Sequence, residues 1–81
     1  MGKQVYSAFY LEGIKDAGSF KRKWNTGEFG DTSPMTTEDM QKELETEVRC
    51  LRLCPGTAVA DMHRGARDYW KNQIKRAKAE G

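Results

Sequence analysis

Residues 57–79 read TAVADMHRGARDYWKNQIKRAKA, and this stretch decides the fold. At about 100° per residue, a helix through it separates two faces. The apolar face comprises Val59, Met62, Ala66, Tyr69, Trp70, Ile74 and Ala77. The other face carries cations at three- and four-residue steps, named here the cationic stripe: Arg64, Arg67, Lys71, Lys75 and Lys78. Such a helix packs by one face and presents the other to water or to a polyanion.

A second helix is predicted to begin after Thr36. Thr36 and Asp39 have the spacing of a capping box, with Asp in place of the usual Glu. Met35 and Met40 occupy the two positions of a hydrophobic staple. The residues that this helix is expected to bury are Met40, Leu44, Val48 and Leu51.

The second helix is predicted to end at Cys54, because Pro55 disfavours helical backbone in the residue before it. Gly56 allows the chain to reverse, and Thr57 is the expected cap of the next helix. Since so few residues connect the two helices, they are predicted to form an antiparallel hairpin.

The N-terminal third is harder to assign. Residues 3–12 show the alternation and the aromatic content of a strand, but they also fit one helical face. We expect a helix, because a lone strand needs a partner. Residues 17–19 are predicted to interrupt the helix, with Ser19 as the cap of a short helix from Phe20 to Trp24. Residues 25–33 are predicted to form a loop.

The predicted fold is therefore a single all-α domain over residues 1–81, a bundle of three to four helices ending in an antiparallel helical hairpin. An α+β fold with an N-terminal strand or hairpin is the alternative. The expected core combines the apolar positions of the two long helices and is closed by Tyr6, Phe9 and Trp24. A domain of 81 residues is near the lower limit for a self-sufficient core, so homodimerisation stays open.

The charge of the chain is unevenly spread. The net charge is +2, yet residues 57–81 carry six Lys/Arg against three Asp/Glu, and residues 34–56 carry three against five. A basic helix on a nearly neutral chain indicates local steering of an acidic partner. No run approaches the roughly 18 apolar residues of a membrane span, and the N-terminus lacks the apolar run of a signal peptide. We therefore expect no membrane partner and a cytoplasmic location.

Cys50, Cys54, His63 and Asp61 are the candidates for metal or nucleophilic chemistry. One histidine with two cysteines four apart falls short of the four Cys/His ligands of structural zinc sites. A Cys–His nucleophile would lack an orienting third group and an oxyanion site. Buried, reduced thiols are the preferred interpretation, and whether the two cysteines bind metal stays open.

Three carboxylates alternate along the second helix, at Glu43, Glu45 and Glu47. Their two-residue spacing is interpreted as a splayed, solvated acidic face. No phosphate-binding glycine loop or zinc-protease histidine pair occurs in the chain. No catalytic residue, metal or cofactor is therefore assigned, and the chain is expected not to be an enzyme.

Aromatic residues accompany a second group of cations. Lys21, Arg22 and Lys23 stand between Phe20 and Trp24, and single-stranded nucleic acid is bound by aromatic stacking in a basic groove. The preferred interpretation is that the two aromatic residues pack into the core while the cations stay in water. Phe29, in the loop, is equally well an interface anchor or a residue that holds the loop to the core.

The leading hypothesis is a small, non-enzymatic binding protein that occupies a surface on a protein or nucleoprotein partner. An inhibitor or adaptor, of the kind that viruses and mobile elements encode, fits this size. Direct nucleic-acid binding through phosphates is the alternative. The expected contact residues are Arg64, Arg67, Lys71, Lys75 and Lys78, with Lys21, Arg22, Lys23, Trp24 and Phe29.

Overall fold

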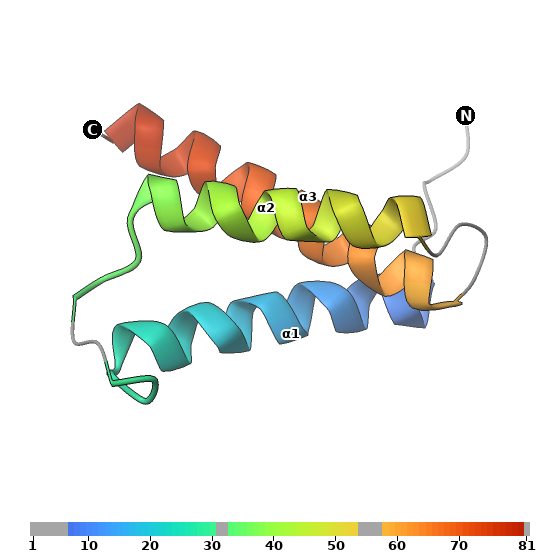
Figure 1. Cartoon of the computed structure of the whole chain (residues 1–81), viewed down its shortest axis with the longest axis horizontal. Coiled ribbons are helices and arrows are strands. Elements are labelled where there is room, and N and C mark those ends of the chain that lie inside the picture. Colours follow the sequence, from blue (N-terminus) through green and yellow to red (C-terminus); the bar gives the residue numbers. More distant parts are fainter. Residues whose placement is uncertain (1–6, 31–32, 54–57, 81) are drawn as a thin grey trace.

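The computed structural model describes residues 7–30, 33–53 and 58–80, which form three helices and no strand. The helices are α1 (Ala8–Asn25), α2 (Thr37–Leu53) and α3 (Ala58–Glu80). Figure 1 shows α1 and α3 running in the same direction, with α2 antiparallel to both. Over their described lengths, α1 and α2 each pack on α3 but not on each other. The prediction of an all-α bundle ending in a helical hairpin is confirmed, and the α+β alternative is not supported.

Helix α1 begins after Ser7, whose Oγ accepts a hydrogen bond from the backbone N–H of Tyr10 at 3.1 Å. The part of the ambiguous N-terminal stretch that the structure describes is therefore helical from Ala8 onward. Residues 3–6, including the predicted core residue Tyr6, lie outside the described residues.

The predicted break at residues 17–19 is wrong, and Ser19 caps no separate helix, because α1 continues to Asn25. The reason is the packing of α1 on α3. Gly13 and Ala17 are buried, and a Cβ atom at Gly13 would lie 1.9 Å from the carbonyl oxygen of Met62. The small residues let the two helix backbones approach closely, and this contact outweighs the low helix propensity of glycine.

Helix α2 starts as predicted. The Oγ1 atom of Thr36 accepts a hydrogen bond from the Asp39 N–H at 3.2 Å, and Oδ2 of Asp39 accepts one from the Thr36 N–H at 3.0 Å. The backbone N–H of Thr36 and, to a lesser extent, its hydroxyl, which donates to Oδ2 of Asp39 at 2.9 Å, lower the pKa of Asp39. Met35 and Met40 are both buried in the core. The predicted stop and the cap at residues 54–57 lie outside the described residues.

The core lies where α3 meets the other two helices, and Trp70 is its centre, with 2% of its surface exposed. The buried residues around it are Ala17, Met35, Met40, Ala66 and Ile74, with Phe20, Trp24, Leu44 and Tyr69 packed against them. Val48 and Leu51, which were expected in the core, are only partly buried.

Two predicted core residues, Val59 and Phe9, are instead each 49% exposed. Both stand in the first turn of their helices, at one end of the bundle. Ala60 and Gly65, which the one-face pattern left out, are buried. Because α3 is packed from two sides, its buried sector is wider than a single stripe. None of the helices, over the residues described, has both the length and the apolar character to cross a bilayer.

Candidate functional site

The cationic stripe divides into two halves along α3. Lys71, Lys75 and Lys78 are exposed and make no hydrogen bond or ion pair with other described residues. Arg64 and Arg67 are half-buried, and each pairs with a carboxylate of the same helix. The C-terminal half is therefore the part of the stripe that can meet an anionic partner without first breaking an ion pair within the described chain.

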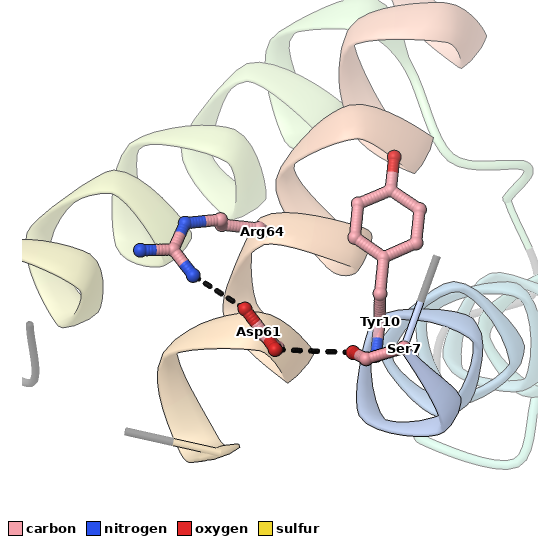
Figure 2. A network of polar contacts seen from close by, with 4 residues as sticks. All are labelled: Ser7, Tyr10, Asp61 and Arg64. Carbon is pink, nitrogen blue, oxygen red and sulfur yellow. Dashed lines mark hydrogen bonds and ion pairs between the residues drawn. The ribbon is translucent and has the colours of Figure 1, made fainter. Parts of the chain in front are cut away.

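Arg64 belongs to a network that joins α3 to the first turn of α1. Its Nη1 atom donates to Oδ1 of Asp61 at 2.5 Å, and Oγ of Ser7 donates to Oδ2 of the same carboxylate at 3.0 Å. Figure 2 shows Asp61 between the two partners, with Ser7 at the N-cap of α1. Arg64 therefore helps to hold the start of α1 against α3.

Arg67 has a similar role one turn further on. Its Nε atom donates to Oδ1 of Asp68 at 3.0 Å, while the Tyr10 hydroxyl donates to Oδ2 of Asp68 at 2.5 Å. Partial burial by itself would raise the pKa of Asp68. The hydrogen bonds from Tyr10 and Arg67 and the charges of Arg67 and Lys71 together have the larger, opposite effect, so the pKa lies below its ordinary value. Asp68 is thus an ionised link between α1 and α3.

The second group of cations lies at the C-terminal end of α1, next to the C-terminal half of α3. Lys21 Nζ donates a hydrogen bond to Oε1 of Gln73 at 2.7 Å. Arg22 is close to Tyr69: burial raises the pKa of the Tyr69 hydroxyl, and the positive charge of Arg22 partly opposes that shift. Lys21 therefore reaches α3 at Gln73, which stands about 160° around the helix from Lys71 and Lys75, so the cations of α1 and the stripe lie on different sides of α3.

A hollow of about 350 Å³ lies beside the contact between α1 and α3, and Tyr10, Ile14, Lys75 and Arg76 are among its lining residues. Lys75 therefore belongs both to the stripe and to the hollow. Arg76 was not predicted, because it stands about 100° away from Lys75 around the helix. In the sequence, Arg76 could have been noticed as the second cation of the pair Lys75-Arg76. In the structure it lines the hollow together with Tyr10 and Ile14 of α1.

The exposed cations of the stripe are named here the basic face: Lys71, Lys75 and Lys78. Lys23 is exposed in the last turn of α1, as Lys78 is in that of α3. Cations in the last turn of a helix also stabilise its dipole, so part of this charge has a structural role.

Trp24 and Phe29 differ in their availability to a partner. Trp24 is half-buried against Phe20, with ring centroids 6.1 Å apart, and its Nε1 is buried without a hydrogen-bond partner among the described residues. Phe29 is 54% exposed although its ring lies 5.2 Å from that of Phe20. Phe29 thus combines a fixed position with an open surface.

The candidates for metal or nucleophilic chemistry do not come together in the part of the chain that the structure describes. His63 Nδ1 lies 2.7 Å from Oε1 of Glu47, and Asp61 is bound by Arg64. Cys50 is half-buried, and Cys54 lies outside the described residues. Within the part of the chain that the structure describes, no three His, Cys, Asp or Glu side chains converge as metal ligands.

The interpretation of Glu43, Glu45 and Glu47 as a splayed acidic face is wrong for two of the three. Glu43 and Glu47 are partly buried and line a groove between α1 and α2, together with Asp16 of α1. Residues four apart occupy the same side of a helix, which the alternating pattern concealed. Only Glu45 is exposed, as the prediction required of all three.

Comparisons of the chain with known protein families, curated proteins and solved structures found no match.

Proposed function

We propose that this chain is a non-enzymatic binding protein that occupies an acidic surface on a protein or nucleoprotein partner through its basic face. The observation that supports this function is that Lys71, Lys75 and Lys78 are exposed along one side of α3 and make no hydrogen bond or ion pair with other described residues. A surface with one sign of charge raises the rate of encounter with a partner of the opposite sign.

Phe29 supplies a second element of the proposal. Binding energy at protein interfaces is concentrated in a few residues, and aromatic side chains set in polar surroundings are enriched among them. Phe29 lies in the loop that follows α1, whose last turn contains Arg22 and Lys23. An exposed ring next to exposed cations fits a protein partner better than a phosphate backbone alone.

The test compares two triple variants that remove the same charge. Lys71→Gln/Lys75→Gln/Lys78→Gln neutralises the stripe, whereas Lys42→Gln/Arg49→Gln/Arg52→Gln neutralises exposed cations of α2. We expect a nuclease-treated cell extract to yield a partner that is retained by the wild type and by the α2 variant. The stripe variant and Phe29→Ala should lose it. A partner retained equally by all four proteins would refute the use of this face.

Direct nucleic-acid binding is the alternative, and the regular spacing of exposed lysines along α3 favours it. Anisotropy titrations with single- and double-stranded oligonucleotides at several salt concentrations test it separately. If three lysines contact phosphates, their neutralisation should reduce the slope of log K against log salt by about 2–3. Absence of binding even at low salt would exclude the nucleic-acid alternative and leave the protein partner.

The proposal includes a cytoplasmic partner, since both cysteines are expected to stay reduced there. Homodimerisation through the same face is not part of it, because like charges would meet. Analytical ultracentrifugation of the wild type and of the stripe variant distinguishes the cases: a dimer that persists in both would use another surface.

A further inference from the structure

A groove runs between α1 and α2 on the side of the bundle where these two helices face each other across α3. It has a volume of about 230 Å³. Its floor is apolar and includes Phe20, Met62 and Trp70. Its walls carry Asp16 from α1, with Glu43 and Glu47 from α2. We name this site the acidic groove, and none of its lining residues belongs to the basic face.

The charge of the acidic groove is unbalanced. No lysine or arginine is among its lining residues, and His63 is the one group there that can become cationic. His63 is paired with Glu47. Asp16 and Glu43 make no hydrogen bond or ion pair with any other described residue. Two carboxylates on opposite walls are therefore left to interact with whatever enters.

Glu43 is held in an unfavourable setting. Burial, followed by the negative charges of Glu47 and Asp39, raises the pKa of the Glu43 carboxyl. Partly buried carboxylates are usually paired, because removing their charge from water is costly. A cation in the groove would supply the missing partner and relieve the repulsion between Glu43 and Glu47.

The size and the floor of the groove restrict the occupant. Sites for drug-sized ligands have volumes of roughly 300–1,000 Å³, so this groove suits a single side chain better than a helix. A guanidinium group matches carboxylates through its planar set of donors, and it also stacks on aromatic rings. Its aliphatic stem could pack along apolar surface such as that of Met62.

We propose that the acidic groove binds an arginine side chain presented by an extended segment of a partner protein. Asp16 and Glu43 would accept hydrogen bonds from the guanidinium group, and Phe20 would lie against its face. This inference does not depend on the basic face, which lies on another side of α3 and requires a ligand of opposite charge.

The test uses a blocked pentapeptide with a central arginine between glycine and serine residues. The same peptide with citrulline at that position is the control, because citrulline has nearly the same shape without the charge. ¹⁵N-labelled protein titrated with the arginine peptide should show amide shifts centred on Ala17, Glu43 and His63. The citrulline peptide should bind at least about tenfold more weakly, as expected for the loss of charged hydrogen bonds.

Matched variants assign the binding to the groove. Asp16→Asn/Glu43→Gln should weaken the arginine peptide by at least about tenfold. Glu38→Gln/Glu45→Gln removes two exposed carboxylates of α2 that do not line the groove and should leave the affinity within about twofold, as for separate surface sites. The amide spectra report whether each variant is folded.

Several results would overturn the proposal. Equal binding of the arginine and citrulline peptides would indicate an apolar occupant. Shifts spread over the outer surface of α2, or equal weakening in both variant pairs, would indicate non-specific attraction to acidic side chains. If the amide shifts of the groove residues change with protein concentration when no peptide is present, the occupant of the groove is a second copy of the chain.

Discussion

The contact between α1 and α3 predicts both the sign and the size of the change in unfolding free energy when a glycine of α1 is replaced by alanine. Gly13→Ala should destabilise the protein, whereas Gly18→Ala should stabilise it. A Cβ atom at Gly13 would lie 1.9 Å from the Met62 carbonyl oxygen. At Gly18 the nearest atom would be Cε1 of Tyr69 at 3.6 Å, which is an ordinary contact. Both substitutions gain about 1 kcal/mol in helix propensity, so only the packing term differs.

The magnitude follows from the overlap at Gly13. A carbon atom approaches a carbonyl oxygen to about 3.3 Å, so α1 and α3 would have to separate by roughly 1.4 Å. A backbone carbonyl cannot rotate away as a side chain can. Overpacking of this kind costs about 1–3 kcal/mol or more, and the separation would also weaken the Tyr10–Asp68 hydrogen bond, worth about 1.5–3 kcal/mol. After the propensity gain, we expect a net loss of about 2–3 kcal/mol for Gly13→Ala.

Urea unfolding, followed by tryptophan fluorescence and far-UV circular dichroism, measures both effects. A chain of this size has a total stability of about 4–12 kcal/mol, so Gly13→Ala should move the midpoint strongly. Gly18→Ala should raise it by the equivalent of about 0.5–1 kcal/mol. The reasoning fails if Gly13→Ala is as stable as the wild type, or if the two substitutions shift the midpoint equally.

Four further substitutions test the core, the α2 cap and two carboxylates. Trp70→Ala should cost about 3–5 kcal/mol, and a melting curve close to that of the wild type would refute its central position. Thr36→Ala should cost about 0.5–2 kcal/mol in urea titrations, and no loss would mean that the cap is not formed. The pKa of Asp68 lies below the ordinary 3.8, so its stabilisation is present above that value and lost as the pH falls through the folded-state pKa; Asp68→Asn should lack this acid-dependent loss. The pKa of Glu43 lies above the ordinary 4.5, so Glu43→Gln should raise stability at neutral pH and not well below pH 4.5.

The sequence predicts α2 and α3 well because their signals are local. The hydrogen bonds between Thr36 and Asp39 are made within one turn, so spacing alone indicates them. The same is true of the cationic stripe, which depends only on helical periodicity. Such features need no knowledge of the neighbouring helices.

The errors occur where a tertiary contact decides. Gly18 indicates a helix break by its propensity, but Ala17 is buried and Phe20 packs against Trp70, so contacts with α3 continue on both sides of Gly18 and α1 stays helical. Phe9 and Val59 look like core residues, yet their turns lie at the end of the bundle and remain half-exposed. Periodicity shows which residues share a face, but it does not show how far along the helix that face is covered.

The acidic groove illustrates the same limit for a functional site. Glu43 and Glu47 are one turn apart, so the sequence alone could have predicted that they lie on the same side of α2. Asp16 lies far away in the sequence and reaches the groove only because α1 packs on α3. The acidic groove combines side chains from three helices, which a single-helix pattern cannot predict.

The central position of α3 gives the two proposed sites a testable relationship. Trp70 forms the floor of the acidic groove, while Lys71, the next residue, belongs to the basic face. Because the sites share a helix but no lining residue, neutralising the stripe should leave arginine-peptide binding unchanged, and Asp16→Asn/Glu43→Gln should leave binding to the acidic partner unchanged. Energies at separate sites add, so simultaneous occupancy would make the chain an adaptor between an acidic and a basic partner. If the two ligands compete, α3 must move when either of them binds. The affinity of the chain for one partner would then fall when the other is bound, which favours the inhibitor over the adaptor.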